Sequence, residues 1–283
     1  MPRIYNLICD GNSITQGNSA SNANLTAWPP VCRELLISSQ AASHSEKYWL
    51  VKNVAISGNT TGQRAAAFNT DVQPQFSTAY GRNIVTFFEV SNDVITNAAT
   101  LNTAITNVQA YVTQARNSGW EVMLSTVPPT TTTTNSANIV IPQFNTWLRD
   151  NPTWSDFPIV EIANHASLSN PANTTFYNVD GLHMTDAGYA VVAGLFHDAI
   201  VATVDSGPTT AGLLKRVVYD FDQLEKSSPS VWATKVSAIT TVTYRRLFQG
   251  GNMDRLRFRY QVYGYDDERL AVVYAELVAA LTP

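Results

Sequence analysis

The chain has few cysteines, few charged residues and no long apolar run, and each shortage narrows what it can be. Cys9 and Cys32 are the only two cysteines among 283 residues. They have no metal-ligand spacing and give little basis for a disulfide, so we expect both to be small buried residues. Charged residues make up 14% of the chain and the formal net charge is -4, which argues against a nucleic-acid-binding protein. No apolar run approaches the ~20 residues that span a bilayer, so no membrane partner is expected.

Several targeting and cofactor motifs are also absent. The amino-terminus runs directly into a strand-like segment at residues 4–9 and lacks the apolar core of a signal peptide, so a cytoplasmic location is the default expectation. No glycine-rich phosphate loop occurs, and we therefore expect no nucleotide, flavin or other cofactor. Thr15 takes the last position of the pattern Gly-x-Ser-x-Gly around Ser13, which counts against an ordinary α/β-hydrolase.

A serine motif and a histidine motif stand out against this background. Residues 11–13 read Gly-Asn-Ser, and residues 180–183 read Asp-Gly-Leu-His. A serine hydroxyl attacks well at neutral pH only when an imidazole takes its proton and a third group orients that imidazole. Ser13, His183 and Asp180 supply these three groups. Either motif alone is more readily interpreted as a turn serine or a solvated Asp/His pair, but together they favour a hydrolase.

Two more segments lie between these motifs, each after a strand-like run. Residues 53–61 read Asn-Val-Ala-Ile-Ser-Gly-Asn-Thr-Thr, and residues 89–93 read Glu-Val-Ser-Asn-Asp. Taken alone, Gly58 could be a plain turn glycine and Asn92 a helix cap. In this order, the four segments resemble the blocks of the SGNH (GDSL-like) hydrolases over roughly residues 4–204.

The resemblance implies a role for five residues. Ser13 would be the nucleophile, with Asp180 and His183 completing a catalytic triad. The backbone amides of Ser13 and Gly58 and the side chain of Asn92 would form the oxyanion hole, and no metal is implied.

The chain departs from the family pattern at two positions. Asn12 replaces the Asp that usually precedes the serine, and Val90 stands where the third block usually has Gly. Asn12 keeps the shape of Asp but loses its charge, so hydrogen bonding near Ser13 could differ. Val90 restricts the backbone, because a β-branched residue tolerates fewer dihedral angles than Gly. Neither change removes a catalytic atom.

Strand-like runs alternate with helical patterns through the first 204 residues. We expect strands at residues 4–9, 48–54, 84–89, 121–127 and 157–162, and helices at residues 30–39, 101–118, 139–150 and 186–203. This alternation predicts an α/β fold with a parallel sheet covered on both faces. The resemblance implies the flavodoxin-like three-layer version with strand order 2-1-3-4-5. Ser13, Gly58 and Asn92 each follow a different strand closely, so they should meet at the carboxyl edge of the sheet.

Other residues near the predicted site carry weaker expectations. Thr185 is a plausible N-cap for the last of these helices, and residues 128–134 should form an exposed loop beside the cleft. His165 could border the cleft. Asp180 and His183 with Asp186 are a conceivable metal site, but Asp186 is better explained as a first-turn acid of its helix.

A second pattern follows a break at residues 205–212. Residues 213–283 show a helix, strands and a closing helix, with Arg255, Arg257 and Arg259 alternating with apolar residues. We therefore predict a hydrolase domain at residues 1–204, a linker at residues 205–212 and a small α+β module at residues 213–283. The module faintly resembles tail-completion or head-tail joining proteins of tailed phages, which would imply a virion-associated location.

The module holds 10 basic and 8 acidic residues. Its arginine face could contact an anionic polymer, but a solvated strand face is the favoured interpretation. We expect the module to support a homo-oligomer or attachment to a particle.

The sequence as a whole predicts a serine esterase. The resemblance implies short acyl esters, often acetyl groups on carbohydrates. One alternative is a lysophospholipase or thioesterase. Another is a carbohydrate-binding or virion structural module with a vestigial site, which the departures at Asn12 and Val90 keep open.

Overall fold

A parallel sheet of four strands lies at the centre of the residues that the structure describes. The structure is a computed structural model that describes residues 3–43, 47–131 and 135–204, all within one unit of residues 1–205. The sheet has the order β2-β1-β3-β4. Its strands are β1 (Arg3–Gly11), β2 (Lys47–Asn53), β3 (Arg82–Phe88) and β4 (Glu121–Leu124). The predicted linker and module, at residues 205–283, lie outside the described residues.

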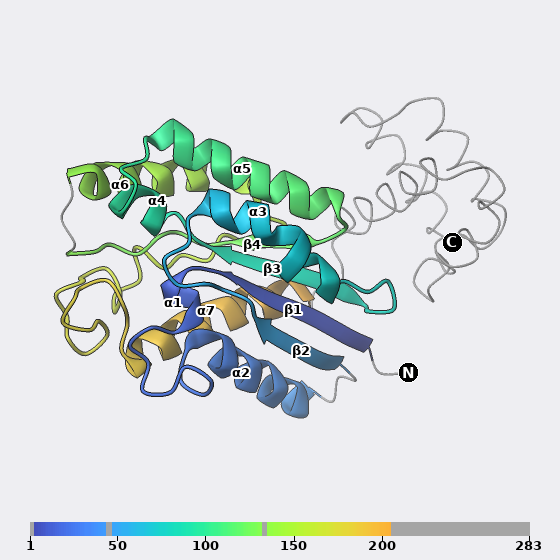
Figure 1. The fold of residues 1–283 in the computed structure, drawn as a ribbon. Coiled ribbons are helices and arrows are strands. Elements are labelled where there is room, and N and C mark those ends of the chain that lie inside the picture. Colours follow the sequence, from blue (N-terminus) through green and yellow to red (C-terminus); the bar gives the residue numbers. More distant parts are fainter. Residues whose placement is uncertain (1–2, 44–46, 132–134, 205–283) are drawn as a thin grey trace, which may run out of the picture. The chain divides into compact units, whose positions relative to one another are not determined.

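Helices cover both faces of this sheet (Figure 1). One layer consists of α2 (Trp28–Ser43) and α7 (Asp186–Val204). The other consists of α3 (Thr61–Asp71), α5 (Leu101–Asn117) and α6 (Asn135–Asp150). Short turns complete the chain: α1 (Ser13–Gln16), η1 (Gln73–Gln75), α4 (Ser91–Ile95) and η2 (Pro152–Trp154). The three-layer α/β fold is therefore confirmed.

Alternation along β1 divides the interior into two cores. Leu7 and Cys9 lie in the core that contains Trp28 of α2, whereas Ile8 lies in the core that contains Phe68 of α3. A strand buried on both faces must be apolar at consecutive positions, which explains the continuous apolar run. Each large apolar side chain buried in this way contributes about 1.5–3 kcal/mol to folding. Both cysteines are free and buried, as expected.

The length and mean hydropathy of the helix α7 bear on the expectation that the chain has no membrane partner. With 19 residues and a mean hydropathy of 1.5, it is the one helix among the described residues that is long and apolar enough to cross a membrane. Its buried residues include Tyr189, Phe196 and Ile200, which pack in the core with α2. A core helix of a globular fold passes the same test of length and composition, and this packing explains why α7 is apolar.

The fifth predicted strand does not form. Residues 157–162 run beside β4, but only Ser125 and Val160 make a parallel bridge there. Pro158 has no N–H to donate, and the Asp156 carboxylate accepts from the Val122 amide at 2.9 Å in place of a strand carbonyl. The predicted order 2-1-3-4-5 therefore holds for the first four strands. The fifth position is represented by a single bridge.

Local signals explain most element boundaries. The expected N-cap of α7 is present, because the Thr185 Oγ1 accepts from the Gly188 amide at 3.3 Å. The helix α3 was not predicted, although Thr60 and Gln63 form a full capping box at its start.

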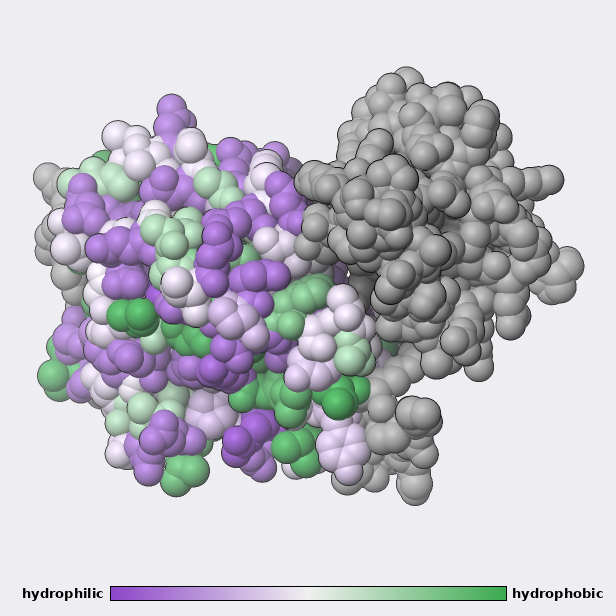
Figure 2. Space-filling view, turned by 45° about the vertical axis from the view of Figure 1, so that its right-hand side comes forward, coloured by the Kyte–Doolittle hydropathy of each residue, from purple (hydrophilic) through white to green (hydrophobic). Residues whose placement is uncertain are grey.

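Some apolar side chains stay at the surface of the edge strand β2. Trp49 and Val51 pack into the core beside α2, but Tyr48 and Leu50 point the other way and are 65% and 46% exposed. In the face shown in Figure 2, apolar residues gather toward the lower right of the described surface.

Candidate active site

Ser13 lies just beyond the carboxyl end of β1, at the first position of α1. The chain must turn sharply there: Gly11 has φ +154°, and a Cβ at this position would approach the Phe88 carbonyl oxygen to 2.4 Å. Asn12 caps α1, since its Oδ1 accepts from the Ile14 amide at 2.9 Å. Ser13 is thereby held on a short helix and is only 6% exposed.

The structure brings Ser13, His183 and Asp180 together. The His183 Nε2 lies 2.8 Å from the Ser13 Oγ, and the His183 Nδ1 lies 2.6 Å from the Asp180 Oδ2. The other carboxylate oxygen, Oδ1, accepts from the amides of Leu182 and His183 at 3.0 and 2.9 Å. Partial burial raises the pKa of Asp180, but these hydrogen bonds outweigh it and lower the pKa below its ordinary value.

This geometry fixes the direction in which a proton can move. An ionised carboxylate only accepts hydrogen bonds, so the bond to Asp180 requires the proton on the His183 Nδ1. The Nε2 atom is then the acceptor for the Ser13 hydroxyl. The three groups therefore have the arrangement that a serine nucleophile and its general base need.

The loop at residues 128–131 supports the turn that carries Asp180 and His183. The Thr131 amide donates to the Gly181 carbonyl at 3.0 Å, and the Thr131 hydroxyl donates to the Asp180 carbonyl at 3.3 Å. Gly181 has φ +58°, and a Cβ there would lie 1.8 Å from the Thr131 Oγ1. The predicted loop therefore borders the site, but it is less exposed than expected, because Pro128 is buried and Thr131 alone among residues 128–131 is exposed. Residues 132–134 lie outside the described residues.

Gly58 and Asn92 lie at the predicted edge of the sheet, after β2 and β3. Gly58 is exposed with φ +79°, and within the described residues its amide and that of Ser13 donate no hydrogen bond. The Asn92 Nδ2 donates to the Asn59 carbonyl at 2.8 Å and keeps a second N–H. Asn92 is the second residue of α4, whose N-cap is Val90, so the interpretation of Asn92 as a cap is wrong.

The two departures from the family pattern are both buried, and Asn12 bonds to the residues on either side of Val90. The Asn12 Nδ2 donates to the Glu89 Oε1 at 2.8 Å and to the Ser91 Oγ at 2.6 Å. Val90 has φ +93° and is 1% exposed. The backbone therefore adopts a conformation here that glycine tolerates readily. This conformation is strained for a β-branched residue such as Val90.

Sequence reasoning missed a buried polar network behind Gly11. The Arg64 Nε lies 2.7 Å from the Asp10 Oδ1, and both side chains are fully buried. The Tyr111 hydroxyl donates to the Asp10 Oδ2 at 2.6 Å. Burial raises the pKa of Asp10, with Arg64 and Tyr111 opposing that rise. The sequence did contain a signal for this network: Asp10 stands at the end of an apolar run, and a buried carboxylate needs a hydrogen-bonding partner.

Asp93, the last residue of the third block, ties α3 to α4. Its Oδ2 accepts from the Thr61 amide at 2.8 Å and from the Thr61 hydroxyl at 2.9 Å. Thr61 begins α3, so this carboxylate also satisfies an amide at a helix amino-terminus. The segments that carry Gly58 and Asn92 are therefore fastened to each other.

The remaining candidates make hydrogen bonds that support the fold. Asp186 accepts from the Ser21 amide and the Thr26 hydroxyl, both at 2.8 Å, and so anchors α7 to the loop before α2. Within the described ranges no group of three His, Cys, Asp or Glu side chains could hold a metal ion. The His165 Nδ1 accepts from the Ser167 amide at 3.3 Å, a bond inside its own turn.

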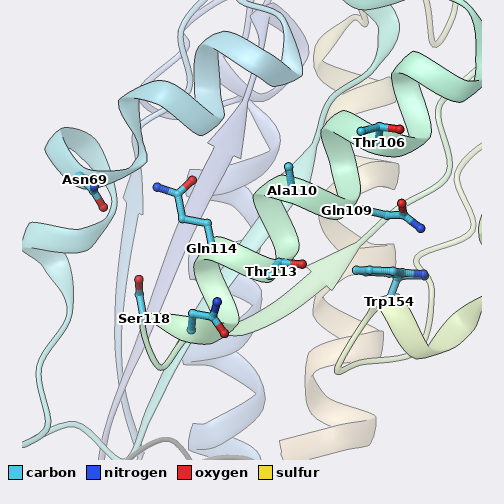
Figure 3. Close-up of a pocket in the computed structure, with 9 residues that line it drawn as sticks. Asn69, Thr106, Gln109, Ala110, Thr113, Gln114, Ser118 and Trp154 are labelled. Atoms are coloured by element: carbon cyan, nitrogen blue, oxygen red, sulfur yellow. The ribbon is translucent and has the colours of Figure 1, made fainter. Parts of the chain in front are cut away.

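A separate groove lies on the outer side of α5 (Figure 3). Thr106, Gln109 and Thr113 of α5, Asn69 of α3 and Trp154 contribute to its lining. No predicted site residue lies in it. The hydrogen-bonded candidate groups converge instead at the carboxyl edge of the sheet.

Residues 9–191 match the model of the GDSL-like lipase/acylhydrolase family. The chain belongs to this family. Membership makes this GDSL-like protein a carboxylic ester hydrolase, in agreement with the resemblance read from its four sequence blocks. No curated protein matches it.

Solved structures show the same fold for this GDSL-like hydrolase. A family 3 carbohydrate esterase of Clostridium thermocellum is 16% identical with a TM-score of 0.54, covering 72% of this chain and 98% of that one. A psychrotrophic esterase of Pseudoalteromonas sp. is 15% identical with a TM-score of 0.52, covering 71% and 98%. An acetylxylan esterase of Geobacillus stearothermophilus is 19% identical with a TM-score of 0.51, covering 69% and 93%.

Proposed function

We propose that this GDSL-like hydrolase cleaves short acyl esters by a Ser-His-Asp mechanism with Ser13 as nucleophile. The observation that carries the proposal is the continuous series of hydrogen bonds from the Ser13 Oγ through His183 to Asp180, at 2.8 and 2.6 Å. A serine, an imidazole and an orienting carboxylate in this geometry form a nucleophile and its general base.

In the first half of the reaction, the Ser13 Oγ attacks the ester carbonyl while the His183 Nε2 takes its proton. The carbonyl oxygen becomes an oxyanion. Three donors would stabilise it: the backbone amides of Ser13 and Gly58 and the second N–H of the Asn92 side chain. Neither backbone amide donates a hydrogen bond within the described residues. Asp180 stabilises the imidazolium. Collapse of the intermediate breaks the bond to the alcohol, which leaves with the proton from His183.

In the second half, water attacks the acyl-serine. His183 takes a proton from the water, and the same donors hold the second oxyanion. Cleavage of the acyl–oxygen bond releases the carboxylic acid and returns the proton to Ser13. The cycle needs no metal or cofactor.

We further propose an acetyl ester of a carbohydrate as the substrate. Support comes from two of the similar structures, which are described as a family 3 carbohydrate esterase and an acetylxylan esterase. Turnover of p-nitrophenyl acetate, of a p-nitrophenyl ester with a long acyl chain and of acetylated xylo-oligosaccharides tests the choice. Preference for the long chain would favour the lysophospholipase or thioesterase alternative.

The mechanism predicts that Ser13→Ala and His183→Ala each abolish turnover, and that the double variant is no slower than either. Groups that act as one unit lose their effect together, so the two losses should not add. Measure kcat for the three variants and for Ser39→Ala, which removes a hydroxyl that donates to the Leu36 carbonyl inside α2. Ser39→Ala should keep wild-type kcat. Turnover by Ser13→Ala within about tenfold of wild type would contradict the mechanism.

A further inference from the structure

Asn12, the residue before the nucleophile, has every hydrogen-bonding group of its side chain engaged. Its Oδ1 accepts from the Ile14 amide at 2.9 Å, and its Nδ2 donates to the Glu89 Oε1 and the Ser91 Oγ at 2.8 and 2.6 Å. It is 1% exposed. One amide side chain thus joins the cap of the helix that carries Ser13 to the segment that follows β3.

Glu89 is the unusual member of this group. It is 3% exposed, and no hydrogen bond reaches its Oε2 from the described residues. The Oε1 accepts from Asn12 and from the Val90 amide, the latter at 3.1 Å. Burial, followed by the nearby charge of Asp93, raises the pKa of Glu89 well above its ordinary value.

The chemistry of Glu89 explains the residue at position 12. An ionised Asp there could not donate to Glu89, and two carboxylate oxygens would face each other at hydrogen-bonding distance in a buried space. Two carboxyl groups this close together in a buried site cannot both be ionised. An amide is therefore the side chain that both caps α1 and satisfies Glu89.

We propose that Asn12 and Glu89 form a positioning pair, in which the buried acid holds the amide that caps α1 and so fixes the Ser13 hydroxyl against His183. This inference rests on the proposed role of Ser13. It makes the departure from Asp at position 12 a compensated change: the acid that the family pattern carries before the serine is replaced by an acid directly after the neighbouring strand β3.

The same carboxyl group supports the backbone after β3. The Glu89 Oε1 accepts from the amide of Val90, whose φ of +93° is unfavourable for a β-branched residue. Asn92 follows two residues later. Glu89 therefore connects the nucleophile segment to the segment that carries the proposed oxyanion donor.

Four variants of the full chain test the pair by steady-state kinetics with p-nitrophenyl acetate. Glu89→Gln keeps an acceptor of the same shape, and kcat should stay within about threefold of wild type. Glu89→Ala frees the Asn12 amide, and kcat should fall about tenfold to a hundredfold with little change in KM, because misplacement of the nucleophile affects the chemical step. Asn12→Asp should lose as much. The exchange Asn12→Asp with Glu89→Gln restores one acid and one amide, and should recover most of the lost kcat.

Asn83→Ala is the matched control. Asn83 is a buried amide at the opposite end of β3 that bonds to Asn6 and Ser77, so its loss should lower the unfolding temperature and leave kcat unchanged. Ser13→Ala separates the two ideas. If Ser13→Ala is inactive but Glu89→Ala has wild-type kcat, or the exchange variant recovers nothing, the pair is wrong and the mechanism stands. If Ser13→Ala turns over ester, both are wrong.

Discussion

At the scale of single residues, the buried ion pair between Asp10 and Arg64 lies directly behind the nucleophile segment. The Asp10 Oδ1 also accepts from the Gly11 amide at 2.8 Å, two residues before Ser13. Arg64→Met should destabilise the fold by about 3–5 kcal/mol, because it leaves a carboxylate buried without its partner. The unfolding free energy of the full chain, from urea titration, measures this loss.

The loss should depend on pH in a defined direction. Burial already raises the pKa of Asp10 above its unfolded value, and removing Arg64 takes away the strongest opposing interaction. The native state then holds a proton more tightly than the unfolded state, so stability is greatest below the unfolded pKa and falls as pH rises through the folded one. Arg64→Met should therefore be least destabilised in mild acid. Arg82→Met, which breaks a less buried pair with Glu121, should cost less, and a flat pH response of Arg64→Met would refute the argument.

At the scale of elements, the turn at residues 180–183 depends on its contact with the loop at residues 128–131. Gly181→Ala would place a Cβ 1.8 Å from the Thr131 Oγ1, at a φ of +58°, which costs an L-residue about 1–2 kcal/mol. The turn must shift, and with it Asp180 and His183. We expect kcat to fall on the order of 10²-fold, since catalysis is sensitive to small displacements.

Two further variants isolate this clash. Gly194→Ala adds the same methyl group on α7, where nothing lies within 4 Å, and should leave kcat unchanged. Thr131→Gly in the Gly181→Ala background removes the clashing hydroxyl and should restore part of the activity. If the double variant is as slow as Gly181→Ala alone, steric contact with Thr131 is not the cause.

Elements were predictable where one local pattern dominates. The apolar runs of β1 and β3 and the spacing of α5 were read correctly from the sequence. The fifth strand was not, because its apolar residues gave the pattern while Pro158 and the side chain of Asp156 removed its hydrogen-bonding partners. The helix α3 was missed because Phe68 and Ala65 are its only apolar residues in the core, too few to mark an apolar stripe, and the capping box at Thr60 was the remaining signal.

The site shows the same division. Ser13, Asp180 and His183 were found because chemistry restricts their residue types and a short spacing links two of them. Glu89 and Arg64 were missed because their importance lies in partners 77 and 54 positions away along the chain. Such pairs exist only after the strands have been placed beside each other, and composition carries no trace of them.

At the scale of the whole molecule, one unit contains all the proposed chemistry. Ser13, Gly58, Asn92, Asp180 and His183 all lie within residues 9–191, the range that matches the family. We therefore propose that residues 213–283 serve assembly or attachment rather than catalysis.

A chain ending after Gly212 tests this division. It retains all four strands of the sheet and both helix layers, whose cores consist of residues between Tyr5 and Val204. Hydrolysis of p-nitrophenyl acetate should therefore keep kcat and KM within about twofold, since a site depends on the groups that form it. The solution mass, measured by light scattering beside the full chain, should fall by more than the removed residues if the module joins protomers. A folded truncated chain, judged by circular dichroism, that has lost turnover would instead mean that residues 213–283 contribute to the active site, and the predicted domain boundary would be wrong.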